Sequence, residues 1–420
     1  MTRLLAIMGS GETAPTMVKP HRQIFEALGS AHVPAVILDT PYGFQANADD
    51  ITAKAIDYFR ASVGHSVEAA ELRRKEGAVP ARREQALARL AAARWVFAGP
   101  GSPTYSLRQW RGTEVPDLLA DKLERDGAVV FASAAALTLG RRTVPVYEIY
   151  KVGTDPEWED GLDLLSFLGP DVAVVPHYDN AEGGNHDTRF CYLGEGRLAR
   201  LEEQMSGDGW VLGVDEHTGC IFDLDAGRAT IVGNGVVTIR RRGSSATVPA
   251  GMTLTIAELA GLAAGPGAES AGARASAVPS VTPAAPAPAP TSLHTEIARW
   301  SDEFDQAIAE RDVEGAVNAV LGLDSTLVSW SGDTHQSDAS DRGRATLRRM
   351  VARLGQLAQE GARDPRQVVG GFVEALLAER AAARAARRYE DADRVREALV
   401  KNGIEVRDSP DGTAWAITGD

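Results

Sequence analysis

The sequence predicts an α/β protein: a doubly wound, mostly parallel sheet with a terminal antiparallel meander, followed by a separate all-α module. Three observations predict this. Up to residue 262, short apolar runs alternate with helix-like stretches, as is typical of parallel strands covered by helices on both faces. Residues 263–292 consist mostly of Ala, Pro, Gly and Ser and predict a semi-stiff linker. Helical periodicity then predominates in residues 293–420.

The first module, residues 1–262, contains runs that predict buried strands because Gly, Pro or polar turns bound them. These are residues 3–8, 34–38, 95–98, 128–132 and 172–176. Helices are expected at residues 51–61, 79–93 and 115–126. Closely spaced runs predict the meander at residues 210–214, 221–224, 230–232 and 236–240. Functional groups in such sheets gather beyond the carboxyl ends of the strands, so the segments that follow the strands hold the candidate residues.

Composition narrows the classes of function. The net charge of −14 over 420 residues argues against nucleic-acid binding by the whole surface and leaves a local basic strip open. Cys191 and Cys220 are too few for a disulfide framework or a cysteine zinc site, and we expect neither a metal nor a cofactor. No apolar run is long enough to span a bilayer, and the chain opens with a strand-like run rather than a signal peptide. We therefore expect a cytoplasmic location and no membrane partner.

Two residues suggest nucleophilic catalysis. Ser133 begins a Ser-Ala-Ala-Ala segment between a predicted strand and a helix, which is the setting of a nucleophile elbow. His177 follows a later strand in a Pro-His-Tyr-Asp-Asn segment and is a candidate general base. Each residue alone also fits an ordinary role, a helix-capping serine or a structural histidine.

The ordered segments resemble the dipeptidase E and cyanophycinase group of serine peptidases, within the class I glutamine-amidotransferase-like (flavodoxin-like) fold. That group has a Ser-Ala-Gly-Ala elbow, an acidic residue about fifteen positions later, and a His in a Pro-His-Phe-Thr-Asn-like segment. Glu148 lies at that spacing from Ser133. Residues 101–105 are similar to the group's Gly-Gly-Asn-Thr-Phe loop, residues 184–189 to its Gly-His continuation, and residues 214–218 to its Asp-Glu-x-Thr segment. The resemblance covers about residues 1–260.

The resemblance implies that Ser133 attacks a carbonyl, His177 transfers the proton and Glu148 orients the imidazole. It also implies oxyanion contacts from the backbone of Ala134 and of Gly101 or Ser102. The substrate would be a small, acidic peptide or amide. Residues expected to bind it are Arg189, Arg197, His186 and Glu216.

The chain departs from this pattern at the elbow. Phe131 and Ala135 stand where the G-x-S-x-G pattern has glycines, which tolerate crowding and a positive φ. Pro100 has no N–H to donate to an oxyanion. A catalytically inactive hydrolase-like domain in a tRNA-associated adaptor is therefore the alternative to a hydrolase.

The second module should be helical at residues 293–310, 313–321, 342–360, 365–385 and 389–402. A polar loop at residues 331–341 and a short irregular tail complete the prediction. Four arginines share one helix face and predict either a phosphate-contacting strip or a solvated surface. They are Arg380, Arg384, Arg387 and Arg388.

The segments 388–399, 403–408 and 411–415 resemble the C-terminal region of cysteinyl-tRNA synthetase, and a weaker likeness extends over about residues 295–418. There, a helical pair with an Asp…Gly-Thr-x-Trp tail helps to bind tRNA. The resemblance implies tRNA contact through residues 377–418, and docking to a protein is the other interpretation. No His-Ile-Gly-His-like or Lys-Met-Ser-Lys-Ser-like segment occurs, so we expect no aminoacylation by this chain alone. A composite interpretation has the hydrolase act on a group carried by tRNA, and the oligomeric state stays open.

Overall fold

The computed structural model describes residues 2–29, 32–76, 79–182, 186–264, 292–310, 312–331, 338–361, 365–409 and 412–418. Residues 265–291, which are nearly all of the predicted linker, lie outside the described residues, as do Gly184, Asn185 and Asp411 of the predicted motifs. The chain divides into two compact units. One comprises Met1–Arg299 with Gly322–Arg344, and the other Trp300–Leu321 with Ala345–Asp420. The expected boundaries at 262 and 293 stay a prediction.

The first unit contains an eight-stranded sheet with the order β14-β11-β10-β1-β5-β4-β2-β3. Strand β1 is parallel to β5 and antiparallel to β10, so it joins a parallel half to an antiparallel half. The strands are β1 (Arg3–Met8), β2 (Ala35–Ile37), β3 (Glu68–Ala69), β4 (Trp95–Ala98), β5 (Gly127–Ala132), β10 (Thr218–Asp223), β11 (Arg228–Gly233) and β14 (Thr253–Thr255). The predicted parallel strands of this sheet are confirmed.

A second, six-stranded sheet has the order β13-β12-β9-β8-β6-β7. Its strands are β6 (Arg142–Thr143), β7 (Glu159–Asp160), β8 (Val172–Val175), β9 (Trp210–Val214), β12 (Val236–Arg241) and β13 (Ser244–Pro249). The predicted fold class is confirmed, and the structure adds that the late antiparallel strands divide between the two sheets. Periodicity shows which residues face a core, but it does not show which strands exchange hydrogen bonds.

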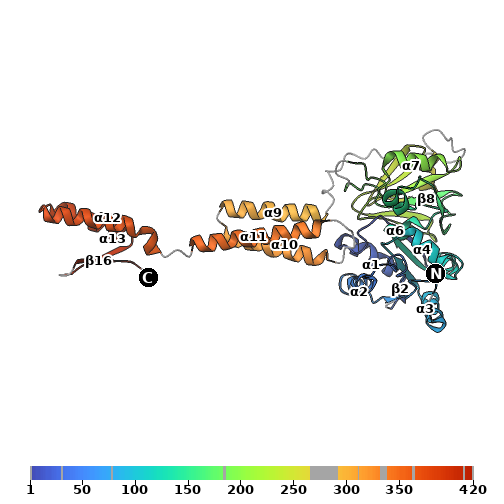
Figure 1. Cartoon of the computed structure of the whole chain (residues 1–420), viewed down its shortest axis with the longest axis horizontal. Coiled ribbons are helices and arrows are strands. Elements are labelled where there is room, and N and C mark those ends of the chain that lie inside the picture. Colours follow the sequence, from blue (N-terminus) through green and yellow to red (C-terminus); the bar gives the residue numbers. More distant parts are fainter. Residues whose placement is uncertain are drawn as a thin grey trace. The chain divides into compact units, whose positions relative to one another are not determined.

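Helices and the second sheet cover the first sheet. The helices of this unit are α1 (Val18–Ala27), α2 (Ala48–Tyr58), α3 (Pro80–Ala92), α4 (Pro103–Trp110), α5 (Val115–Glu124), α6 (Ser133–Leu137), α7 (Gly194–Glu203) and α8 (Ile256–Gly261), with one-turn elements η1 (Pro15–Met17), η2 (Phe59–Val63), η3 (Glu148–Val152) and η4 (Leu262–Ala264). On β1, Leu4 and Ala6 pack with α1 and α2, whereas Leu5 and Ile7 pack with α3, α5 and the second sheet. Figure 1 shows α1 and α2 together beside the parallel strands.

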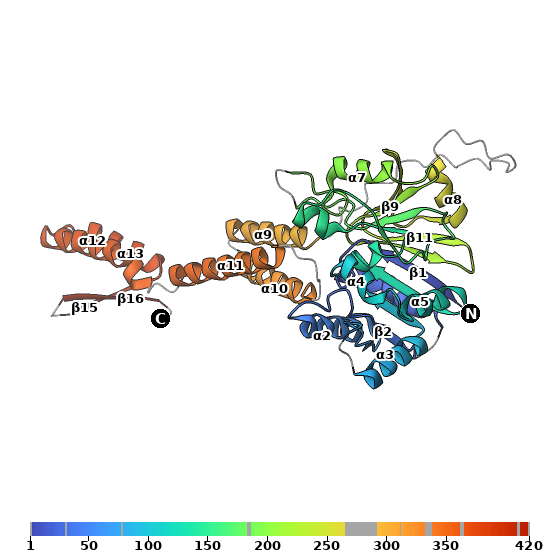
Figure 2. The same cartoon turned by 45° about the vertical axis from the view of Figure 1, so that its right-hand side comes forward.

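The second sheet is also covered on both faces. Leu212 and Val214 of β9 pack toward the first sheet, whereas Val211 packs with Leu198 and Leu201 of α7. Figure 2 shows α7 lying over β9. The alternation of buried side chains along β9 therefore joins the two sheets and α7 into one layered core.

The rest of the chain is helical up to its end. The elements are α9 (Leu293–Glu310), α10 (Val313–Ser329), α11 (Ala339–Gly361), α12 (Pro365–Ala385), α13 (Tyr389–Lys401), β15 (Ile404–Ser409) and β16 (Gly412–Ile417). The predicted irregular tail was wrong, since β15 and β16 form an antiparallel pair. Ile404 and Val406 of β15 pack on Val373 and Leu377 of α12, so the tail alternates as a strand should. No helix among the described residues is long and apolar enough to cross a bilayer.

Candidate active site

Ser133 lies at a sharp turn between a buried strand and a helix. Strand β5 ends at Ala132 and helix α6 begins at Ser133, whose φ is +51°. A non-glycine residue rarely adopts this left-handed conformation, and where it does, the surroundings must enforce it. The turn places the Ser133 side chain at the carboxyl edge of the first sheet, where functional groups of doubly wound folds gather.

The two residues that stand in place of glycines near Ser133 are buried in the core. The side chain of Phe131 is fully buried and its ring lies 5.9 Å from the ring of Trp110. Ala135 is also fully buried, and its N–H donates to the carbonyl oxygen of Gly99 over 3.2 Å. The larger side chains therefore point into packed space, and the turn at Ser133 keeps its left-handed geometry.

His177 lies within hydrogen-bond reach of Ser133. It follows β8, and its Nε2 is 2.8 Å from Oγ of Ser133. The backbone of His177 is also left-handed, with a φ of +48°, and its carbonyl oxygen accepts a hydrogen bond from the N–H of Cys191 over 3.1 Å. Ser133 follows a strand of the first sheet and His177 a strand of the second. The left-handed backbone at both residues thus places the serine hydroxyl within hydrogen-bond distance of the imidazole.

The carboxylate at the other side of the imidazole belongs to Glu216. Its Oε1 lies 2.9 Å from Nδ1 of His177 and accepts a hydrogen bond from Nδ2 of Asn180 over 3.1 Å. The N–H of Glu216 donates to Oδ1 of Asp179 over 2.8 Å. Side-chain and backbone contacts therefore hold the Glu216 carboxylate where it can orient the imidazole.

Glu148 does not take the position at His177 that the sequence predicted for it. Its Oε1 accepts a hydrogen bond from Oγ1 of Thr104 over 2.8 Å, away from the imidazole. Glu216, expected to bind substrate, is the residue at Nδ1. Strand pairing explains why Glu216 reaches His177. Strands β8 and β9 are parallel neighbours with Val175 opposite Gly213, so the residues that follow the two strands meet at one edge of the sheet.

Two of the residues expected to supply oxyanion contacts border the cavity at Ser133. Gly101 and Ala134 both line the cavity that contains Ser133 and His177. The N–H of Ser102 donates to the carbonyl oxygen of Pro41 over 2.9 Å, so the predicted choice between Gly101 and Ser102 falls on Gly101. Position 101 requires glycine, because its φ is +140° and a Cβ would lie 2.0 Å from the Pro41 oxygen.

The cavity at Ser133 has a volume of about 240 Å³, and three tyrosines contribute to its wall. Its other lining residues are Leu137, Val146, Tyr147, Tyr150, Lys151, Glu182, Thr188, Cys191 and Tyr192. The Lys151 ammonium lies 4.8 Å from the centre of the Tyr150 ring, and Oη of Tyr192 donates to Glu182 over 2.8 Å. The wall therefore presents one cation and one carboxylate to a bound molecule.

The arginines expected to bind substrate lie outside this wall. Arg189 forms an ion pair of 2.8 Å with Asp187, which holds the pKa of that carboxyl well below its usual range. Arg197 is exposed and donates to the carbonyl oxygen of Leu193. His186 is exposed too, at 3.4 Å from Oη of Tyr150. Lys151 is the cation that the sequence prediction missed, since a single lysine after Tyr150 carries no pattern of its own.

Two buried groups near the site have shifted proton affinities. Burial raises the pKa of the Cys191 thiol to about 12, so Cys191 is not a thiolate nucleophile at neutral pH. Burial first, and then the nearby carboxylate of Asp179, raise the pKa of Asp215 to about 7. Its Oδ2 accepts a hydrogen bond from the N–H of Val236 over 2.9 Å.

The predicted arginine strip of the second unit is largely engaged within the protein. Arg380 is buried and forms two hydrogen bonds of 2.7 and 2.6 Å with Asp408. Arg384 lies 3.1 Å from the same carboxylate, and Arg388 pairs with Asp391 over 2.8 Å. Arg387 is exposed and forms no ion pair with any described residue. Of the four predicted arginines, Arg387 is thus the exposed one without an ion pair to a described residue.

The N-terminal and C-terminal parts of the chain are similar to different known proteins. Residues 371–415 match the cysteinyl-tRNA ligase anticodon binding domain. The cysteine–tRNA ligase of Methylibium petroleiphilum is 39% identical over 94 residues, which are 22% of this chain and 20% of that protein. The cysteine–tRNA ligase of Clavibacter michiganensis subsp. michiganensis is 35% identical over 148 residues, 33% of this chain and 28% of that protein. The chain spans less than a third of the length of these curated relatives.

The N-terminal part has the fold of a peptidase of known structure. The crystal structure of a peptidase from an acI-B1 actinobacterium is similar with a TM-score of 0.50 and 17% sequence identity. The similarity covers 61% of this chain and 97% of that one. At this identity the likeness establishes the fold alone.

Proposed function

We propose that the first unit is a serine hydrolase, a peptidase or amidase that acts on small molecules. The observation that carries the proposal is the unbroken set of contacts from Ser133 Oγ to His177 and from His177 to Glu216, at 2.8 and 2.9 Å. A serine, a histidine and a carboxylate in this order are the machinery of acyl transfer. The peptidase-like fold supports the proposal.

The reaction begins when Oγ of Ser133 bonds to the substrate carbonyl carbon and gives its proton to Nε2 of His177. Glu216 accepts the Nδ1–H bond and stabilises the imidazolium, while the N–H groups of Gly101 and Ala134 bind the oxyanion. The C–N bond then breaks, and the leaving amine takes the proton from Nε2. Water attacks the resulting ester by the same steps, which releases the acid and restores Ser133.

The cavity suits a small substrate that carries an acidic group. A volume of about 240 Å³ accommodates one or two amino-acid residues, below the usual range for drug-sized ligands. Lys151 supplies the cation for a substrate carboxylate, a role that the resemblance to dipeptidase E assigns to a basic group. We propose this role for Lys151 in place of Arg189 and Arg197, and we expect the protein to act in the cytoplasm.

A fluorophosphonate probe tests the proposal, because it labels a serine only where a base activates the hydroxyl. The wild-type chain should be labelled at Ser133, and the variants Ser133→Ala and His177→Ala should not be labelled. Ser166→Ala, which removes an exposed serine of the same unit, should label like the wild type. A folded wild-type chain that resists the probe would leave the inactive hydrolase-like domain as the better interpretation.

We propose a second function for the second unit, binding of tRNA, because residues 371–415 match an anticodon binding domain. The exposed arginines Arg387 and Arg396 form no ion pair with any described residue and are the candidates for phosphate contact. Electrophoretic mobility shifts with total tRNA should show salt-dependent binding that Arg387→Glu with Arg396→Glu abolishes. Arg348→Glu, on α11 outside the matched residues, is the control. Equal binding by the double variant and the wild type would refute this role.

A further inference from the structure

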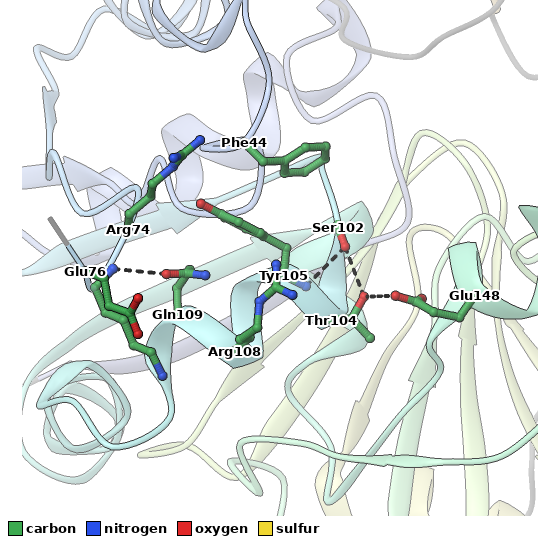
Figure 3. A pocket seen from close by; sticks show the side chains of 10 residues that line it. Phe44, Arg74, Glu76, Ser102, Thr104, Tyr105, Arg108, Gln109 and Glu148 are labelled. Atoms are coloured by element: carbon green, nitrogen blue, oxygen red, sulfur yellow. Dashed lines mark hydrogen bonds between the residues drawn. The ribbon is translucent and has the colours of Figure 1, made fainter. Parts of the chain in front are cut away.

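A second, larger cavity lies next to the serine site. It has a volume of about 720 Å³, and two segments supply residues to both cavities. Ser102 and Thr104 line the larger cavity while Gly101 lines the smaller, and Glu148 lines the larger while Tyr147 lines the smaller. Figure 3 shows the larger cavity, whose other lining residues are Phe44, Arg74, Lys75, Glu76, Tyr105, Arg108 and Gln109. No step of the proposed hydrolysis uses it.

Three cations of this cavity have no carboxylate partner. Among the residues that the structure describes, Arg74, Lys75 and Arg108 form no ion pair. The preceding residue shows the contrast: Arg73 is paired with Asp39 and Asp49 at 2.8 and 2.7 Å. Unpaired cations around a concave surface attract anions, and here they occur in a chain of net charge −14. Glu76 and Glu148 also line the cavity, so its wall carries three cations and two carboxylates and favours an anionic ligand.

Two aromatic rings line the same space. The ring of Phe44 is 46% exposed and lies 5.1 Å from the ring of Tyr105. The guanidinium of Arg108 lies 5.4 Å from the centre of the Tyr105 ring. Tyr105 is itself buried, so the exposed ring of Phe44 offers the stacking surface for a planar group, and Tyr105 supports it from below.

A carboxylate oxygen of this cavity lacks a donor. Oε1 of Glu148 accepts from Thr104, whose Oγ1 lies 3.1 Å from Oγ of Ser102. Oε2 of Glu148 is buried and has no hydrogen-bond partner among the described residues. A buried, unsatisfied carboxylate oxygen is costly, so a rotation of the Glu148 side chain that brings this oxygen to a ligand N–H or O–H would be favoured. Figure 3 shows Glu148 and Thr104 on one side of the cavity and Arg74 on the other.

We propose that this cavity binds a nucleoside phosphate. The phosphate oxygens pair with Arg74, Lys75 and Arg108, the base lies against the ring of Phe44, and a sugar hydroxyl or base amino group donates to Glu148. An inorganic anion would leave the rings and the carboxylate unused, and an uncharged aromatic molecule would leave the cations unused. The same chemistry is found in a free nucleotide and in the terminal nucleotide of an RNA.

Isothermal titration calorimetry of the full chain tests this with AMP, adenosine, inorganic phosphate and the ribotrinucleotide CCA. AMP should bind at least about tenfold more tightly than adenosine or phosphate, because each of these lacks one set of contacts. Arg108→Glu and Phe44→Ala should each weaken AMP binding by about tenfold or more. Arg82→Glu reverses the charge at another exposed arginine of the same unit that forms no ion pair with a described residue. This control variant should bind AMP like the wild type. Tighter binding of CCA than of AMP would identify an RNA end as the source, and equal or weaker binding a free nucleotide.

Three outcomes would overturn the proposal: no heat of binding with AMP or CCA at millimolar concentration, phosphate binding as tight as AMP binding, or an equal loss in the Arg82→Glu and Arg108→Glu variants. Arg108 and Phe44 both lie at exposed positions, so both variants should fold, and circular dichroism of each variant checks this. The assay measures binding without turnover. A failure here is therefore separate from a failure of the proposed hydrolase.

Discussion

At the scale of single residues, the choice between two carboxylates decides how the candidate site works. Glu216 accepts a bond from His177 and Glu148 accepts one from Thr104. Of the two, only Glu216 contacts Nδ1 of His177 and so can hold the imidazole with its Nε2 free to take a proton from Ser133. The difference predicts unequal effects of the same conservative change.

Glu216→Gln should slow fluorophosphonate labelling of Ser133 by about 10²–10⁴-fold, because the amide neither fixes the imidazole tautomer nor stabilises the imidazolium. Glu148→Gln should slow it at least about tenfold less. The rate constants of labelling provide the measurement, and Glu203→Gln, at an exposed position of α7, controls for loss of charge. If Glu148→Gln proved the slower variant, Glu216 would lose the role assigned to it here.

Asp215 predicts a dependence of stability on pH. Its pKa is raised to about 7 in the folded protein, above the ordinary value near 3.8 of the unfolded chain. The folded state therefore binds the proton more strongly, and the stability from this group is complete below pH 3.8 and lost as pH rises through about 7. Asp215→Asn removes this loss of stability at high pH, because the amide does not ionise. The amide oxygen can still accept the hydrogen bond from the N–H of Val236.

Thermal unfolding should thus show Asp215→Asn melting about 5 °C above the wild type at pH 8 and close to it at pH 4. Asp208→Asn, at an exposed aspartate, should show no such difference between the two pH values. A gain of the same size at both values would contradict the raised pKa of Asp215.

At the scale of elements, the turn that contains Gly101 connects β4 to α4 and borders both cavities. Gly101→Ala should lower the labelling rate of Ser133 by about tenfold or more, because the methyl group would lie 2.0 Å from the Pro41 oxygen and displace the N–H proposed for the oxyanion. Gly112→Ala is a matched control, since φ there is +72° and no atom lies within 4 Å of the added Cβ. It should cost about 1 kcal/mol of stability and preserve labelling. Equal labelling of both variants would argue against the role of Gly101.

The hairpin at the end of the chain is tied to α12 by a buried charge. Asp408→Asn leaves the guanidinium of Arg380, which is 4% exposed, without its anion and should destabilise the hairpin by about 2 kcal/mol. Hydrogen–deuterium exchange of residues 365–418 should become faster. Glu405→Gln, whose partner Arg407 is exposed, should leave the exchange nearly unchanged. Exchange in Asp408→Asn as slow as in the wild type would show that the pair is dispensable.

The sequence predicted where helices and strands lie better than it predicted which strands pair. The apolar runs of β1, β4, β5 and β8 were located within a residue or two, and α9 and α12 were bounded correctly, because burial and helical periodicity are local properties. The division of the late strands between two sheets, and the pairing of β15 with β16, depend on which backbones exchange hydrogen bonds. The same limit applied at the candidate site. The sequence paired Ser133 with His177, which both follow strands. It assigned Glu216 another role, because the contact of Glu216 with His177 arises from strand pairing.

At the scale of the whole molecule, the hydrophobic clusters around the two sheets draw their members from residues 4–263. The stretch Gly322–Arg344 groups with the first unit but contributes no member, among its described residues, to those clusters. The cluster under the terminal hairpin draws on residues 369–417. Ser133, His177 and Glu216 lie within the stretch that these clusters enclose. The ring of Trp330 lies 5.3 Å from the ring of His217, the residue after Glu216, so we ask whether the geometry of the serine site needs that contact.

A chain that ends at residue 264 tests this. It keeps every member of the clusters that enclose the two sheets and loses the contact of Trp330 with His217. It should unfold cooperatively and be labelled at Ser133 at a rate within about twofold of the full chain, since a domain with its own core folds alone. The complementary chain, residues 292–420, should retain the tRNA binding proposed for the second unit and resist the probe. Loss of Ser133 labelling in a shortened chain that still unfolds cooperatively would show that residues beyond 264 support the serine site. The two proposed activities would then have to be treated as one coupled function.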